Sequence, residues 1–245
     1  MSENIIQECE TRLNSLQRGI ETATGESYND LTEAVKGAVD CAVFKNIIQE
    51  SIYANHKTNS AYNNFDIFTN TSVKDVSMFD FSKVVKLNYS LSGCTALESL
   101  EINISSATTM QYLCQNCHNI KSVNLIGMTD KVLYIPGAFF KCYNLEEIKL
   151  LNVAGISAGG FGTNTSNYTF GRCDNLKEIR FVPECIKVSL WIADSPLLSD
   201  ESIQNIIEGL ATVETAQTLT LHKNVKAKLT AEQLATITNK NWSVA

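Results

Sequence analysis

Proline, basic clusters and long apolar runs are scarce in this sequence, and each absence removes a class of protein. Only 3 of the 245 residues are proline and 44% are hydrophobic, so the chain is neither a proline-rich linker nor a disordered segment. No stretch approaches the ~18 consecutive apolar residues of a membrane-spanning helix, so we expect no membrane insertion. The net charge of −6 is spread without a basic block, which argues against a nucleic-acid partner.

The N-terminus also lacks the features of an export signal. It begins MSENIIQE, which is polar and acidic, with no basic segment ahead of an apolar run. We therefore expect synthesis in the bacterial cytoplasm without a signal peptide. In that compartment the 8 cysteines are expected to be reduced thiols.

What the sequence does contain is a recurring phrase that opens on a cysteine. Cys94, Cys117, Cys142 and Cys173 each begin the pattern C-x-[NA]-[LI]-x-x-[ILV]-x-[ILF]. Repeats of a few tens of residues are typical of solenoids, in which neighbouring copies stack. The last two apolar positions of each copy share one face of an extended strand: Leu100/Ile102, Val123/Leu125, Ile148/Leu150 and Ile179/Phe181. We expect these strands to form a parallel sheet over a continuous core, with the cysteines as small buried turn residues.

This phrase resembles the BspA-like branch of the leucine-rich repeats, whose units carry an Ala-Phe pair, a cysteine and then N-L-x-x-I-x-[IL]. The segment from Ala138 to Ile148 is the closest match, followed by the segment from Phe170 to Leu176. The resemblance covers roughly residues 90–198 and implies an α/β solenoid, a leucine-rich-repeat stack with N-terminal helices and a helical C-terminal cap. That family includes bacterial surface antigens, protozoan surface proteins and phage structural proteins, so the resemblance implies fold more specifically than function.

Helices are expected on both sides of the stack. Four segments follow from the patterns: N-terminal helices over 1–50, a connector over 51–72, the solenoid over 73–198 and the cap over 199–245. In the cap, Ser199 is a helix N-cap, Thr230 and Gln233 form a capping box, and a strand separates the two helices. Ser195 stands where the next cysteine would fall, which suggests that the stack ends there.

The first 24 residues carry a heptad-spaced apolar seam. Its members are Ile6, Cys9, Leu13, Leu16 and Ile20. Two interpretations remain open: a helix that packs on its own domain, or an oligomer interface in a short coiled coil that joins copies of the chain, for example as a trimer.

Both ends of the chain carry a second resemblance. Residues 194–210 and 219–245 look like the C-termini of repeat proteins from tail modules of phages and prophages of gut bacteria, and residues 28–35 resemble the L-T-x-A-V helices that precede such repeats. This implies a structural or binding component of a tailed-phage virion, in the tail, baseplate or fibre, with other virion proteins as partners. The alternative is a bacterial BspA-like adhesion or scaffold protein.

The sequence contains no group of residues that requires a catalytic, cofactor-binding or metal-binding role, because each candidate group has a simpler structural explanation. Cys114 and Cys117 form a C-x-x-C pair, but no second pair completes a zinc site, and the repeat already accounts for Cys117. Gly159–Gly162 lacks the spacing of a phosphate loop. Outward positions beside the strands carry Glu147 and Glu178 next to Lys149 and Arg180, where ion pairs between neighbouring strands are expected. We therefore expect a protein that is not an enzyme and has no cofactor.

One repeat is longer than the others, and its extra residues fall in the segment from Val153 to Tyr168. Insertions in solenoids emerge as loops on one edge and often carry recognition. The candidate partner-binding residues are Phe161, Asn164 and Tyr168. The partner would be a sister subunit, or a glycan or protein on a host surface; the alternative is a loop without a partner.

Overall fold

The computed structural model describes residues 14, 18, 49, 52 and 68–245. The chain divides into two units, Met1–Ser51 and Ile52–Ala245, and almost all of the described residues belong to the second. The expected coiled-coil seam at Ile6, Cys9, Leu13, Leu16 and Ile20 lies outside the described residues, as does most of the connector.

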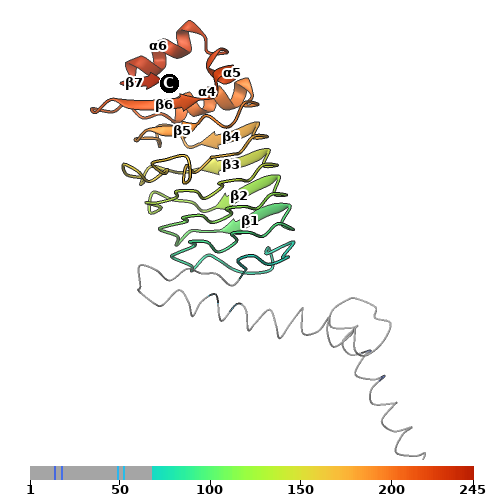
Figure 1. Ribbon diagram of the computed structural model, residues 1–245. Helices are drawn as coiled ribbons and strands as arrows, with labels where there is room; N and C mark the ends of the chain where they lie inside the picture. Colours follow the sequence, from blue (N-terminus) through green and yellow to red (C-terminus); the bar gives the residue numbers. More distant parts are fainter. Residues whose placement is uncertain (1–13, 15–17, 19–48, 50–51, 53–67) are drawn as a thin grey trace, which may run out of the picture. The chain divides into compact units, whose positions relative to one another are not determined.

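Four parallel strands form one sheet, with one strand from each repeat. They are β1 (Ser99–Asn103), β2 (Ser122–Ile126), β3 (Glu147–Leu151) and β4 (Glu178–Phe181), in sheet order β1-β2-β3-β4. Leu100 lies beside Val123, Val123 beside Ile148 and Ile148 beside Ile179, so equivalent positions of the repeat are in register. The coils are stacked one upon the next (Figure 1), and this solenoid-like arrangement buries one face of β1, β2 and β4, as the repeat predicted.

The recurring cysteines are buried and bridge successive coils through their thiols. Each Sγ–H donates to a main-chain carbonyl of the preceding coil. The acceptors are the carbonyl oxygens of Phe68, Leu91, Cys114 and Phe139, at 2.9, 2.9, 3.0 and 3.2 Å from the sulfurs of Cys94, Cys117, Cys142 and Cys173. A thiol thus satisfies a backbone group that water cannot reach, which is why a small weak donor recurs at this position.

The asparagine two residues after the cysteine has the same kind of role. The side-chain amides of Asn119, Asn144 and Asn175 donate to the carbonyl oxygens of Thr95, His118 and Tyr143, each at 2.8 Å. Each acceptor belongs to the residue that follows the cysteine in the preceding coil. The C-x-N part of the motif is therefore explained by contacts between coils.

Strand β3 departs from the expected pattern. The register between β3 and β4 shifts between Ile148 and Leu151, so that Leu151 lies beside Phe181. Leu151 is 1% exposed, whereas Leu150 is 54% exposed. The prediction that Leu150 shares the core face with Ile148 is therefore wrong, because a bulge reverses the alternation at that point.

A helix covers the edge of the four-stranded sheet. Helix α4 (Asp200–Gly209) begins after the N-cap Ser199, as predicted, and lies along β4. Its Ser202 Oγ accepts a hydrogen bond from Ile179 N at 2.9 Å, and its Asn205 Oδ1 accepts one from Phe181 N at 2.6 Å. These two side chains accept hydrogen bonds from edge N–H groups of β4, which the carbonyl oxygens of a fifth strand would otherwise accept.

The parallel stacking nevertheless continues past Ser195 in a second sheet. Strands β5 (Leu190–Ile192), β6 (Gln217–Leu221) and β7 (Trp242–Val244) pair in that order, near α5 (Lys223–Lys226) and α6 (Ala231–Asn239) (Figure 1). Ser195 therefore lies after the last strand of the four-stranded sheet, between β5 and β6 of this second sheet. The buried Ser195 hydroxyl itself donates to the carbonyl oxygen of Cys173 at 3.2 Å, so it acts much as the cysteines do.

Candidate functional site

The long third repeat returns to the coil after a short excursion. Ile135 N donates to Gly160 O at 2.9 Å and Phe139 N donates to Thr169 O at 3.0 Å, so the chain leaves the coil after Gly160 and rejoins it at Thr169. The excursion is closed at its base by a bond of 2.9 Å from Thr169 N to Phe161 O. The residues between them, 161–168, form a loop that we call the insertion loop.

The insertion loop is held by its own polar side chains. Asn167 Oδ1 accepts hydrogen bonds from the backbone N–H groups of Thr163 and Asn164, at 2.8 and 2.9 Å. Asn164 Oδ1 accepts one from Ser166 N at 2.9 Å. Gly162 has φ +97°, and a Cβ there would overlap the carbonyl of Asn167, so only glycine fits this turn. The loop therefore has a defined shape.

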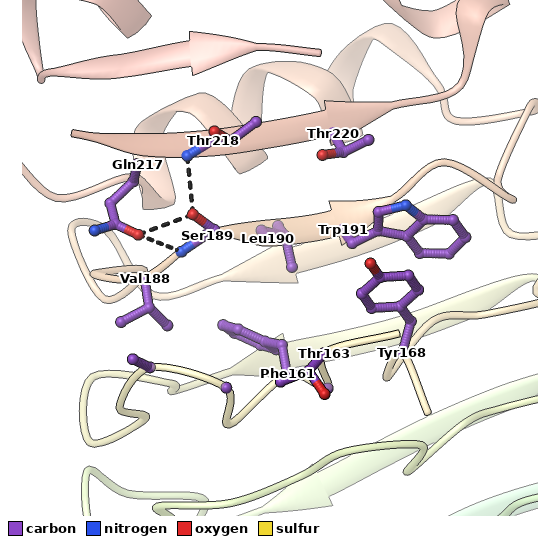
Figure 2. Close-up of a pocket in the computed structure, with 13 residues that line it drawn as sticks. Phe161, Thr163, Tyr168, Val188, Ser189, Leu190, Trp191, Gln217, Thr218 and Thr220 are labelled. Carbon is purple, nitrogen blue, oxygen red and sulfur yellow. Dashed lines mark hydrogen bonds between the residues drawn. The ribbon is translucent and has the colours of Figure 1, made fainter. Parts of the chain in front are cut away.

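A cleft of about 350 Å³ separates this loop from the second sheet. One wall comes from the insertion loop and the two residues before Gly160, and the other comes from β5, the two residues before it, and β6 (Figure 2). We call this space the insertion cleft. Its lining residues are Ala158, Gly159, Phe161, Gly162, Thr163, Tyr168, Val188, Ser189, Leu190, Trp191, Gln217, Thr218 and Thr220.

A network of hydrogen bonds fixes the wall made by β5 and β6. Gln217 Oε1 accepts from both Ser189 N and Ser189 Oγ, at 2.8 and 2.9 Å. Thr218 N in turn donates to Ser189 Oγ at 3.0 Å. The parallel register places Trp191 beside Thr220. Figure 2 shows this network at one end of the cleft and the aromatic pair at the other.

That aromatic pair joins the two walls. The rings of Tyr168 and Trp191 lie 4.2 Å apart between centroids and 11° from parallel, and both side chains are half-buried. Phe161, which also lines the cleft, is only 3% exposed. Stacked aromatic side chains give the cleft a rigid apolar part with polar tips, namely the Tyr168 hydroxyl and the Trp191 indole N–H.

Four polar side chains of the cleft make no hydrogen bond within the described part of the chain. They belong to Thr163, Tyr168, Trp191 and Thr220. None of the thirteen lining residues carries a charge. The cleft therefore offers donors and acceptors to a neutral ligand.

The three predicted loop residues have different surroundings. Tyr168 lines the cleft and stacks on Trp191, Asn164 is exposed at the loop tip and stabilises a turn, and Phe161 is buried with its ring as part of the cleft lining. Trp191 and the β6 threonines were missed as site residues. The alternation Thr218-Leu-Thr220-Leu predicts outward-facing threonines, but nothing in the sequence indicates that β6 lies near a loop some fifty residues earlier.

The other candidates from the sequence occupy structural positions. Cys114 and Cys117 are both fully buried, and burial raises the pKa of the Cys114 thiol. In the described part of the chain, no three histidine, cysteine or acidic side chains are grouped so that they could hold a metal ion. Among the described helices, none has the length and apolar character to cross a membrane.

The expected ion pairs beside the strands are arranged differently from the prediction. Arg180 pairs with Glu201 of α4 at 2.8 Å rather than with an acidic residue of its own sheet. One ion pair between coils joins Lys177 to Glu146 at 2.9 Å, and Lys177 lowers the pKa of the Glu146 carboxyl by this hydrogen bond and by its charge. All four side chains are largely exposed, so these pairs contribute little to stability.

The register of the repeats and the buried cysteines define a leucine-rich-repeat protein with a solenoid-like fold. Residues 62–191, just over half of the chain, match the BspA type leucine rich repeat region in six copies, and the chain belongs to that family. Searches of curated proteins and of solved structures gave no match. Leucine-rich repeats generally mediate protein interactions, so this membership indicates an interaction or adhesion role and leaves the partner open.

Proposed function

We propose that this chain is a non-enzymatic binding protein in which the solenoid holds the insertion cleft as its recognition surface. The observation that carries the proposal is a set of four polar side chains without hydrogen-bond partners in the described residues. Thr163 and Tyr168 belong to the ordered insertion loop, and Trp191 and Thr220 belong to the β5–β6 wall. A preformed concave site with a few convergent polar groups is the usual form of a ligand site. The cleft also lies on the repeat that runs from Cys142 to Cys173, which is longer than the two repeats before it.

The chemistry of the lining favours binding over catalysis. The cleft has no carboxylate, histidine, cysteine or lysine that could act as nucleophile or general base. Elsewhere the buried thiols have raised pKa values, as burial does for Cys142 and Cys173, so they remain protonated at neutral pH. These features support the assignment of the protein as a binding component.

We place this binding protein in the virion of a tailed phage, as a tail, baseplate or fibre component. The support is the resemblance of residues 28–35, 194–210 and 219–245 to phage tail-module repeat proteins. In this role the N-terminal heptad seam would join copies of the chain or attach it to other virion proteins, and the solenoid would be a spacer or host-contact module. The protein would then be found in particles after assembly in the bacterial cytoplasm.

The test is the composition and adsorption of purified particles. We expect mass spectrometry to find the chain in intact particles at a fixed ratio to the major tail protein. Antibodies raised against the full chain should reduce adsorption of the particles to host cells. Absence from particles would contradict the virion assignment.

A bacterial adhesion or scaffold protein is the second candidate, and family membership is the observation that favours it. In that case the chain would be found in the envelope or in cytoplasmic complexes of a bacterium that produces no particles. Fractionation of such cells with the same antibodies separates the two settings. Both settings retain the insertion cleft as the binding surface.

A further inference from the structure

We infer that the insertion cleft binds a neutral saccharide, as a terminal or internal unit of a longer glycan. The inference rests on the proposed function as a binding protein and names the ligand class of that same cleft. Three properties of the lining point to this class: its lack of charge, the combination of ring surfaces with hydroxyl groups, and the rigidity of both walls.

The lack of charge excludes most other ligands of this size. Phosphates, carboxylates and cationic groups are bound in proteins by side chains of opposite charge or by helix ends, which supply charge-assisted hydrogen bonds. The thirteen lining residues supply no such side chain. A neutral ligand, in contrast, loses little solvation energy on entering this cleft, because its hydroxyls exchange water for neutral donors and acceptors.

The distribution of polar and apolar groups fits a sugar ring. A pyranose carries hydroxyls around its rim and C–H bonds on its faces, so it needs both kinds of contact at once. Hydroxyls of Thr163 and Thr220, the Tyr168 phenol and the Trp191 indole N–H all lack partners in the described structure. Apolar surface in the same lining comes from the half-buried side chains of Val188, Tyr168 and Trp191, because Phe161 and Leu190 are only 3% and 1% exposed (Figure 2).

Both walls are fixed by internal hydrogen bonds, so little ordering is required when the ligand binds. The Asn167 side chain holds the loop, and the contacts among Ser189, Gln217 and Thr218 hold the β5–β6 wall. Stacking of Tyr168 on Trp191 restricts the two largest side chains of the cleft. Preorganisation matters for a small polar ligand because its gross interaction energy is modest.

The experiment measures binding of the purified full chain to saccharides. The probes are glucose, galactose, mannose, rhamnose and N-acetylglucosamine, each as monomer and short oligomer, followed by an array of bacterial surface glycans. Saturation-transfer NMR and tryptophan fluorescence report binding. Fluorescence is informative because Trp191 lines the cleft, whereas Trp242 is 3% exposed and donates to Ala211 O. We expect at least one neutral saccharide to bind, and to bind equally well at low and high salt.

The variant Thr220→Val tests the position of the ligand. It removes one free hydroxyl at constant shape and is expected to weaken saccharide binding roughly three- to tenfold, as the loss of one neutral hydrogen bond does. Thr212→Val is the matched control, since Thr212 is exposed and lies outside the cleft. Circular dichroism and thermal unfolding establish that both variants fold. Equal weakening in both variants, or in neither, would overturn the inference.

Other outcomes separate this inference from the function on which it rests. Selective binding of sialylated, phosphorylated or otherwise charged glycans would overturn the neutral assignment. Retention of peptides, sensitive to Thr220→Val and without saccharide binding, would assign the cleft to a protein partner. If the array shows no binding while the chain is found in adsorbing particles, the saccharide inference fails and the proposed function stands. If saccharides bind but particles lack the chain, the virion assignment fails alone.

Discussion

At the scale of single residues, the recurring cysteine shows how chemistry and architecture can be confused. A free thiol suggests a nucleophile or a metal ligand only when it is accessible and its pKa is low. All six described cysteines are buried. Burial raises the pKa of the Cys142 and Cys173 thiols, and each of these thiols donates a hydrogen bond to the coil before it. A buried thiol that donates a hydrogen bond to the backbone has a structural role and is not a reactive group.

The reactivity of these thiols can be predicted directly. Because only the thiolate reacts with alkylating agents, and because raised pKa values suppress it, we expect no modification of the six buried cysteines by iodoacetamide at pH 8 in the native chain. The experiment uses the variant Cys9→Ser/Cys41→Ser, which removes the other two. Mass spectrometry should show six additions per chain only after denaturation in guanidinium. Rapid native modification at Cys114 or Cys117 would contradict the structural role.

At the scale of elements, the bulge in β3 separates what a pattern can predict from what packing decides. The sequence reads Ile148-Lys-Leu150-Leu151, and strict alternation selects Leu150 as the core residue. The structure instead buries Leu151 and shifts the register with β4. Because Leu150 and Leu151 are equally hydrophobic, hydrophobicity alone cannot predict which of the two is buried.

The difference in burial between Leu150 and Leu151 can be tested with a matched pair of substitutions. We expect Leu151→Ala to lower the free energy of unfolding by about 2–5 kcal/mol, because it leaves a cavity beside Phe181. Leu150→Ala should cost less than about 0.5 kcal/mol, since its side chain is 54% exposed. Urea unfolding of both variants measures the difference. If Leu150→Ala were the more destabilising variant, the result would contradict the register shift and indicate that Leu150 is the buried residue.

The contact between α4 and β4 gives the second prediction at this scale. Ser202→Ala leaves the buried N–H of Ile179 without its acceptor, and we expect a loss of about 1–3 kcal/mol in the free energy of unfolding. Alanine is the better helix former by up to ~0.5 kcal/mol, so propensity opposes this loss. Glu201→Ala is the control on the same helix. It removes only an exposed ion pair with Arg180, and it should cost well under 1 kcal/mol. Similar effects in both variants would show that the helix does not satisfy the strand edge.

The sequence predicted those elements whose signals are local or repeated. The four strands, the burial of the cysteines, the Ser199 cap and the capping box at Thr230 and Gln233 all follow from patterns within one repeat or one helical turn, and the structure confirms them. The insertion cleft depends instead on which coils become neighbours. Tyr168 meets Trp191 and Trp191 lies beside Thr220 only because parallel stacking brings three separate segments together. No pattern within one segment contains that information.

At the scale of the whole molecule, a stack of coils gives stability that is roughly additive along its length. Such a scaffold tolerates a loop inserted in one coil, because each coil contacts only its neighbours. The insertion loop uses this tolerance: the coil resumes at Thr169, and the thiol of Cys173 still donates to Phe139 O. Recognition can therefore diverge in the loop and the β5–β6 wall while the repeats keep the fold.

The remaining prediction concerns the number of chains that act together. A glycan-binding cleft of modest affinity gains strength when several copies act at once, and the heptad seam of the N-terminal residues would supply those copies. We expect the full chain to sediment as a homo-oligomer, and the variant Leu13→Asp/Leu16→Asp to sediment as a monomer with unchanged near-ultraviolet circular dichroism. Asn14→Asp is the control, since Asn14 is helical, exposed and off the seam. The oligomer proposal is wrong if the full chain sediments as a monomer at every concentration, or if the control dissociates as the double variant does. Because the seam and the cleft lie in separate parts of the sequence, the monomeric variant should bind a soluble monosaccharide with unchanged affinity and lose only its retention on a glycan-coated surface.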